Sequence, residues 1–270
     1  MQLCRFKQTG SEHARYGMIE GDEVFPFDSF NLSNRASLDE LAEARVGSPV
    51  PLGEVRLLAP VAPSKIVCVG RNYKEHAAEL GNPMPSEPLL FFKPPSSIIA
   101  HDEAIELPRV SAQVEYEGEL GVVIGRRASH LKESDDALQY VFGYTCVNDV
   151  TARDLQRKDV QFTRAKSFDT FCPVGPYVVT NLDPSDVKLE TRLNSETRQS
   201  GRTAQMAFPV AYLIRYISHV MTLEAGDLIS TGTPAGVGPM QEGDTVEVEI
   251  EGVGVLRNNV RARETAPADV

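Results

Sequence analysis

The sequence predicts an α+β fold rich in β-strands, in which a large domain with a mixed β-sheet follows a small N-terminal domain. Strand-like segments outnumber helix-like ones, and the two kinds do not alternate regularly, which argues against a doubly wound parallel sheet. A cluster of glycine and proline at residues 47–51 marks a candidate linker. We therefore expect an N-terminal domain over residues 1–62 and a larger domain over residues 63–270.

The N-terminal segment combines a hairpin signal with a helix signal. Residues 14–19 and 24–27 have strand-like composition and flank Glu20-Gly21-Asp22, which suits a tight turn. Ser37 and Glu40 have the spacing of a capping box, in which each side chain binds the other residue's backbone and starts a helix. These elements predict a small α+β unit.

The larger domain is expected to open with a buried strand and a short helix. The strand spans residues 65–69, and the helix spans residues 72–80, with Gly81 in the position of a C-terminal cap. Further strands are expected at residues 89–92, 114–124, 244–250 and 254–256, and further helices at residues 134–141, 151–158 and 209–221. The last two strands should form a hairpin.

Composition and charge exclude several classes of protein. The formal net charge of -11 argues against nucleic acid as a main partner, because phosphate binding needs a basic surface. The four cysteines lack CxxC spacing, which favours a reducing compartment. No apolar run is long enough to span a bilayer, and the first residues lack the layout of a signal peptide, so we expect a cytoplasmic protein with no membrane partner.

Three alternate glutamates, Glu115, Glu117 and Glu119, fall within the expected strand of residues 114–124. Side chains alternate along a strand, so all three should share one face. Alternation alone does not indicate a site, because it recurs in a strand interpreted as half-exposed, at Glu247, Glu249 and Glu251. The strand of residues 114–124 continues as a run that is apolar on both faces, which indicates a strand covered on both sides. Burying acids at the start of such a strand is costly unless they are paired or bind a metal.

Asp149 offers a third carboxylate. It follows an apolar-rich segment and precedes the helix expected from residue 151, so the local pattern favours helix capping over metal binding. With two glutamates, however, it would suit a hard cation that prefers six oxygen ligands, Mg²⁺ or Mn²⁺. Such a site leaves positions open for water or for the two chelating oxygens of a 2-oxo acid.

His76 and Glu79 lie three residues apart on the expected helix and are therefore neighbours on one face. A carboxylate that orients an imidazole is a common arrangement for a general base acting on water, although most pairs at this spacing lie on a solvated surface. Lys166 could be a surface lysine or could bind a substrate carboxylate as a point charge.

Six segments together resemble the fumarylacetoacetate hydrolase superfamily. In order they are VCVGRNYKEHAAELG, PLLFFKP, VEYEGELGVVIG, VNDVTARDLQ, AKSFDTFCPVGP and TGTPAGVGP, spread over residues 65–256. The branch that they resemble most is the acylpyruvase and oxaloacetate decarboxylase-like one. The resemblance implies a fumarylacetoacetate hydrolase-type mixed β-sheet catalytic domain behind a smaller N-terminal domain, usually as a homodimer.

The resemblance also implies roles for individual residues. The family's metal ligands fall on Glu117, Glu119 and Asp149, which leaves Glu115 outside the site. The lid-helix pair that is proposed to activate the attacking water falls on His76 and Glu79, and the active-site lysine falls on Lys166. Substrate-binding positions fall on Arg71, Gln156 and Thr233.

The expected function is a Mg²⁺-dependent hydrolase that cleaves a carbon–carbon bond in a small 2-oxo acid of acylpyruvate or fumarylacetoacetate type, through a metal-bound enolate. The pair of His76 and Glu79 favours hydrolysis. The same residues could serve an isomerase, a keto–enol tautomerase or a decarboxylase acting on oxaloacetate or a related 2-oxo diacid. A non-catalytic small-acid-binding protein is a remote alternative that would need a lost metal ligand or a lost pair.

Overall fold

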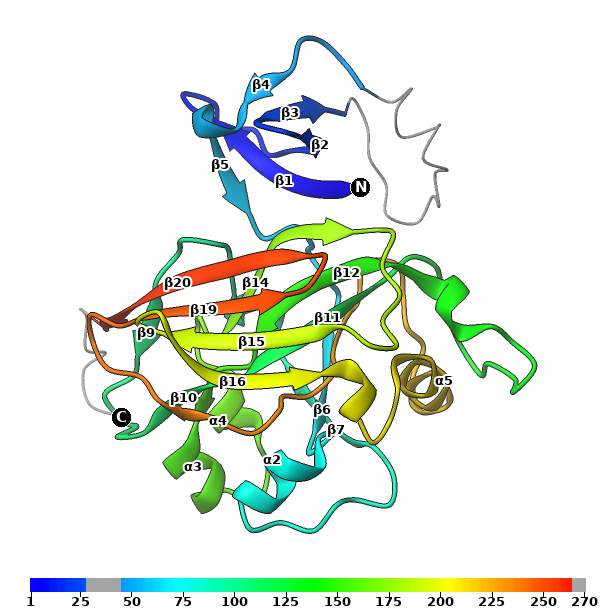
Figure 1. The fold of residues 1–270 in the computed structure, drawn as a ribbon, viewed down its shortest axis with the longest axis vertical. Helices are drawn as coiled ribbons and strands as arrows, with labels where there is room; N and C mark the ends of the chain where they lie inside the picture. Colours follow the sequence, from blue (N-terminus) through cyan, green and yellow to red (C-terminus); the bar gives the residue numbers. More distant parts are fainter. Residues whose placement is uncertain (28–44, 264–270) are drawn as a thin grey trace.

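A computed structural model describes residues 1–27 and 45–263, and strands predominate within these ranges. The strand-rich α+β fold expected from the sequence is confirmed. The strands form three sheets, and Figure 1 shows the N-terminal strands above the larger part of the chain. The helix expected from Ser37 and Glu40 lies outside the described residues.

The N-terminal strands form one end of the longest sheet. β2 (Arg15–Glu20) and β3 (Glu23–Pro26) form the expected hairpin, and β1 (Gln2–Gln8) pairs with both β2 and β5 (Val55–Leu58). β4 (Val50–Pro51) pairs with β3. The cluster of chain breakers expected to form a linker therefore runs into this sheet, because proline is tolerated in a short edge strand.

The same sheet continues from β1 into the larger part of the chain. β14 (Cys172–Val179) pairs with β1, with Leu3 opposite Val178. The order beyond β14 is β12 (Val141–Asn148), β11 (Gly118–Ile124), β17 (Leu228–Ser230), β6 (Ile66–Gly70) and β7 (Leu89–Lys93). Most neighbours are antiparallel, but β17 pairs with β6 in parallel, as does β14 with the short β8 (Ile98–Ile99), so the sheet is mixed.

A five-stranded sheet covers one face of this long sheet. Its order is β16 (Glu196–Arg202), β15 (Lys188–Leu193), β19 (Thr245–Ile250), β20 (Gly254–Ala262) and β9 (Ile105–Leu107). Figure 1 shows β15, β16, β19 and β20 in front of β11, β12 and β14. Aliphatic side chains such as Leu120, Val248 and Leu256 fill the space between the sheets, so one core joins them. The hairpin expected at the C-terminal end is confirmed by the pairing of β19 with β20.

The helices are short, except for one that packs into the core. α2 (Lys74–Glu79), α3 (Arg153–Lys158) and α4 (Thr163–Lys166) lie together at one end of the sheets (Figure 1). α5 (Val210–Val220) confirms the helix expected at residues 209–221, and it buries the aliphatic side chains Leu213, Ile214 and Ile217. Gly81 ends α2 with φ 68°, as a glycine cap should.

The strand expected over residues 114–124 is broken at Glu117. β10 (Val114–Tyr116) belongs to a separate small sheet with β13 (Thr151–Ala152) and β18 (Gly238–Pro239), whereas β11 belongs to the long sheet. The three glutamates therefore do not lie on one continuous strand. The break arises because the two halves pair with different partners, which alternation within one segment does not reveal.

Two expected helices also differ from the structure. The prediction of a helix over residues 134–141 is wrong, because only a 3-10 turn (Ala137–Tyr140) forms and Val141 already belongs to β12. The β-branched and aromatic residues that follow gain more by pairing with β11 than by continuing a helix. The helix expected from residue 151 begins later, at Arg153, because Thr151 and Ala152 pair with β10.

Candidate active site

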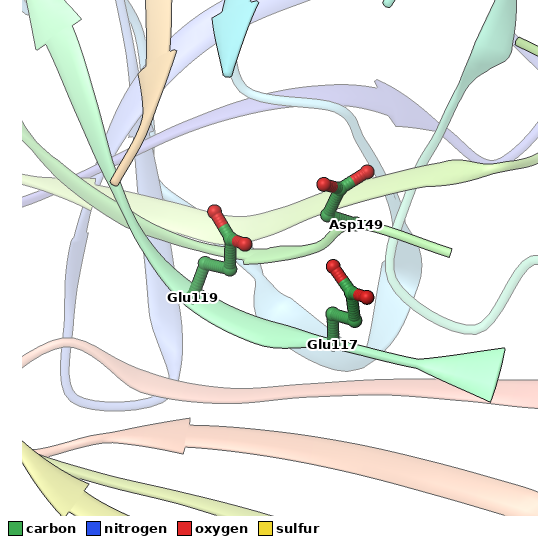
Figure 2. A group of neighbouring side chains, drawn as sticks. All are labelled: Glu117, Glu119 and Asp149. Atoms are coloured by element: carbon green, nitrogen blue, oxygen red, sulfur yellow. The ribbon is translucent and has the colours of Figure 1, made fainter. Parts of the chain in front are cut away.

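Three buried carboxylates converge where β11 begins and β12 ends. Glu117 lies in the break before β11, Glu119 lies on β11, and Asp149 directly follows β12. Glu117 is 4% exposed, Glu119 is 2% exposed and Asp149 is 1% exposed. One carboxylate oxygen from each residue lies within 4.8 Å of the other two. Figure 2 shows the three side chains as neighbours.

The pairing of β11 with β12 brings these residues together. Gly118 lies opposite Asn148, and the Asp149 N–H donates to the Glu117 carbonyl at 2.8 Å. The Asn148 side-chain oxygen accepts the Glu117 N–H at 2.9 Å. The backbones of Glu117 and Asp149 are thus positioned by the hydrogen bonds that join β11 to β12. The capping role that the local pattern favoured for Asp149 is wrong, because α3 follows Ala152 without a side-chain cap and the Asp149 carboxylate binds lysines instead.

Two lysines and an arginine surround the carboxylates. Lys166 Nζ lies 2.8 Å from Glu117 Oε2 and 2.7 Å from Asp149 Oδ2, and Lys93 Nζ lies 2.6 Å from Asp149 Oδ1. Arg153 donates to Glu117 and, through Nε, to Glu115 at 2.7 Å. Glu115 therefore stands outside the carboxylate cluster, where it orients Arg153.

The environment separates the acidity of the two glutamates. Burial raises the pKa of Glu119 to about 8, and repulsion from Asp149 and Glu117 acts in the same direction. Its Oε2 accepts hydrogen bonds from the Ser230 hydroxyl and from the Gly232 N–H, at 2.8 Å. Burial also acts to raise the pKa of Glu117, but the charges of Lys166 and Arg153 lower it well below its usual range.

The donor set fits a divalent cation. The buried acids outnumber the buried cations by four to three: the acids are Glu115, Glu117, Glu119 and Asp149, and the cations are Lys93, Arg153 and Lys166. With all four acids ionised, one net negative charge remains at the site, and a cation with oxygen-preferring chemistry would relieve the repulsion that adds to the effect of burial on the pKa of Glu119. Each carboxylate has about four acceptor positions, so lysines and a cation can share it.

The second run of alternate glutamates provides a contrast. Glu247 and Glu249 on β19 bind the Arg192 side chain across the sheet, and their side chains are 26% and 43% exposed. This confirms the interpretation of that strand as half-exposed. Because both runs have the same alternation, burial and pairing across strands, rather than spacing, distinguish the site.

The expected contact between His76 and Glu79 is present. His76 is 4% exposed, and its Nδ1 lies 3.4 Å from Glu79 Oε2. Glu79 also accepts the Gly236 backbone N–H, at 3.0 Å and 3.2 Å from its two oxygens. The carboxylate therefore links α2 to the Gly-rich loop that follows β17 and, through this loop, to the residues that hold Glu119.

A cavity of about 190 Å³ brings the site residues together. The cavity is lined by every residue to which the resemblance gives a role except Glu79, which is exposed and contacts His76: Arg71, His76, Glu117, Glu119, Asp149, Gln156, Lys166 and Thr233. Gln156 accepts a hydrogen bond from Arg153 at 2.6 Å, and the Thr233 hydroxyl donates to the Gly118 carbonyl at 2.8 Å. The volume lies below the range of about 300–1,000 Å³ that is typical of pockets for drug-sized ligands, so the cavity suits a small ligand.

Three residues with strong contacts in the site were not singled out from the sequence. Lys93 ends the strand β7, Arg153 begins α3, and Ser230 ends β17. A lysine after four apolar residues in a Pro-flanked strand was an available signal for Lys93, because such a side chain needs a buried partner. Arg153 and Ser230 carry no comparable local signal, since long-range pairing places them.

Comparison with known families adds an independent line of evidence. Residues 65–261 match the family described as fumarylacetoacetate (FAA) hydrolase C-terminal, and residues 1–60 match a family described as Rv2993c-like, N-terminal. The chain is 44% identical over 224 residues to oxaloacetate tautomerase YisK of Bacillus subtilis, covering 77% of this chain and 74% of that protein.

Solved structures resemble the whole chain. A protein named 2-hydroxyhepta-2,4-diene-1,7-dioate isomerase from Mycobacterium marinum superposes with a TM-score of 0.87 and 40% identity, covering 98% of this chain and 100% of that one. A fumarylacetoacetate hydrolase from Exiguobacterium antarcticum superposes with a TM-score of 0.86 and 42% identity, covering 97% of this chain and 100% of that one. This chain belongs to the fumarylacetoacetate hydrolase family. It is an enzyme of that family by its fold and its site, and the family's divalent metal fits the buried carboxylates.

Among the described residues, no helix has both the length and the apolar character needed to cross a bilayer.

Proposed function

We propose that this enzyme catalyses keto–enol tautomerisation of a small 2-oxo acid and that a divalent metal is its cofactor. The observation that carries the proposal is the small cavity, whose floor holds three converging carboxylates and Lys166 and whose wall includes the buried His76. Proton transfer beside a keto group needs such an arrangement of a base and positive charge. The names of two relatives, a tautomerase and an isomerase, support proton transfer as the reaction.

The bound metal would supply Lewis-acid chemistry at the keto oxygen. The chain's own residues perform the remaining tasks. Lys166 holds Glu117 and Asp149 in place. Its charge would stabilise the negative charge that develops on the oxygen of a substrate bound in this cavity. Arg153 fixes Glu117 from the other side.

His76 is the group that we assign to the proton at the carbon beside the keto group. Its Nδ1 contacts Glu79, so Nδ1 carries the proton in the neutral ring and Nε2 remains free as the acceptor. In the ketonising direction, the enol hydroxyl releases its proton to solvent and protonated His76 delivers a proton from Nε2 to the carbon, after which solvent protonates the imidazole again. Enolisation runs through the same transfers in reverse, with Nε2 as the acceptor. His76→Ala should lower the rate by about two to four decades, the usual contribution of a general base.

The test compares metal-stripped with Mg²⁺-loaded protein on oxaloacetate, following enol decay by absorbance and products by NMR. Metal-dependent ketonisation without carbon–carbon cleavage, lost in His76→Ala, supports the proposal. Ketonisation at the same rate with and without enzyme would reject it. Mn²⁺ replacing Mg²⁺ in the same assay would compare the two metals that the donor set accepts.

Hydrolysis of a carbon–carbon bond is the second candidate, and the contact between His76 and Glu79 favours it. A carboxylate that orients a buried imidazole also suits the activation of a water molecule. The name of the Exiguobacterium structure supports this alternative. Acetylpyruvate distinguishes the two reactions, because only hydrolysis releases pyruvate and acetate from it.

A further inference from the structure

Two arginines on the cavity wall differ from the other cations there. Arg153 and Lys166 are bound to carboxylates of the site. Arg157, on the exposed rim, donates only to the neutral side-chain oxygen of Gln113. Arg71 makes no hydrogen bond or ion pair with any residue in 1–27 or 45–263. Both guanidinium groups thus lack a carboxylate partner within the part of the chain that the structure describes.

The backbone holds Arg71 in an unfavourable conformation. Its φ of 55° is left-handed, a conformation that residues with a side chain adopt rarely because the Cβ atom clashes with the backbone. The next residue, Asn72, is fully buried and fixes this turn with three hydrogen bonds. Its side-chain amide donates to the carbonyls of Phe208 and Thr231 at 3.1 Å and 2.7 Å, and its oxygen accepts the Phe208 N–H at 2.8 Å. Strain that is over-determined in this way is typical of functional positions.

The charges at the cavity floor leave no partner for a second anionic group. Once Glu119 is ionised, as metal binding requires, the four acids and three cations have one net negative charge, a divalent cation would change this to one positive charge, and the carboxylate beside the keto group of a 2-oxo acid would then balance it. A second carboxylate on the substrate would need other cations. Arg71 and Arg157 are the remaining cations that line the described cavity, and guanidinium groups match carboxylates in geometry.

We propose that Arg71 and Arg157 form a subsite for a distal carboxylate, by which the enzyme selects 2-oxo diacids over 2-oxo monoacids. The inference rests on the proposed function, because it specifies which 2-oxo acids that site accepts. Arg71 is the stronger contributor, since it is half-buried and its charge is less screened. Arg157 is exposed and therefore contributes less.

The experiment compares two ligands that differ only at the distal end: oxaloacetate and 2-oxosuccinamate, whose distal group is a neutral amide. Both kcat/KM for proton exchange into D₂O and affinity by calorimetry are measured on Mg²⁺-loaded protein. Arg71→Gln should lower both kcat/KM and affinity for oxaloacetate by about 10- to 100-fold, as expected for the loss of a hydrogen bond to a charged group. For the amide, both quantities should fall by less than about threefold. Arg157→Gln should lower the same two quantities for oxaloacetate by about two- to fivefold. Arg71→Lys should recover part of the loss.

Lys158→Gln is the matched control, because Lys158 is an exposed cation at the same end of α3 and does not line the cavity. It should leave the ratio between the ligands unchanged. Equal affinity of wild-type protein for the two ligands, or equal losses for both in Arg71→Gln, would overturn the subsite. An affinity preference that depends on Arg71, without proton exchange in either ligand, would support the subsite and reject the tautomerase.

Discussion

At the scale of single residues, Lys93 shows how closely charge is balanced at the site. Its ammonium group is buried against Asp149, so Lys93→Met leaves four buried acids facing two cations. Breaking a buried pair in this way should destabilise the metal-free protein by about 3–5 kcal/mol. Mg²⁺ displaces the proton of Glu119 and neutralises the two excess charges of the four ionised acids, so the rise in Tm on adding Mg²⁺ should be larger than in wild type. Lys188→Met, at an exposed pair with Glu190, serves as the control, and an equal or smaller rise in Lys93→Met would contradict this account.

Glu119 makes metal binding depend on pH. Its pKa of about 8 means that the folded, metal-free protein holds a proton there at neutral pH, and a metal must displace it. Mg²⁺ affinity should therefore rise with pH and level off above about pH 8, with close to one proton released per ion near neutrality. Because folding raises this pKa, the metal-free protein should lose stability as pH rises from about 4.3 to 8.

Calorimetric titrations in buffers with different ionisation enthalpies measure the proton release directly. An affinity that is constant between pH 6 and pH 8, with no proton released, would show that Glu119 is already ionised in the metal-free protein. Thermal melts without metal over the same range check the sign of the stability effect.

Residues also differ in how well the sequence predicts their role. The carboxylates Glu117 and Glu119, and the pair of His76 and Glu79, follow from motifs, and the structure brings them to one cavity. Asp149 could not be assigned from its neighbours, because an acid before a helix has the same pattern whether it caps or binds cations. Lys93 binds Asp149, which lies 56 residues further along the chain, and Arg153 binds Glu115, which lies 38 residues earlier. Only the fold reveals such pairs.

At the scale of elements, α2 is attached to the loop after β17 through one carboxylate. Glu79 accepts the Gly236 N–H and contacts His76, so it both fastens the helix and orients the imidazole. Glu79→Gln keeps an acceptor for the N–H but loses the charge beside His76, whereas Glu79→Ala loses both. Both variants should therefore lower the rate, but only Glu79→Ala should speed hydrogen exchange of the α2 amides.

Hydrogen exchange followed by mass spectrometry, together with the rate on oxaloacetate, separates the two roles. Glu75→Gln is the control, because Glu75 is exposed on the same helix. Full activity of Glu79→Gln would limit Glu79 to fastening the helix. Unchanged exchange in Glu79→Ala would show that the contact with Gly236 does not hold α2.

The elements that the sequence predicts poorly share one cause. α5 and the C-terminal hairpin form as expected, because periodicity and local pairing determine them. The break at Glu117 and the early start of β12 at Val141 depend on partners far along the chain. A pattern within one segment shows which residues avoid water, but it does not show which strand will cover them.

At the scale of the whole molecule, β1 joins the N-terminal part to the catalytic part within one sheet. The division at residue 62 stays a prediction, and we propose that the two parts nevertheless unfold together, because Leu3 lies opposite Val178 and packs with Val174 in a shared cluster. Leu3 is 3% exposed, so Leu3→Ala should cost about 2–5 kcal/mol and shift a single calorimetric transition to lower temperature. Lys7→Ala, on the same strand in a surface ion pair, should cost at most about 1 kcal/mol. Two transitions, of which Leu3→Ala lowers only one, would instead show that the parts unfold independently.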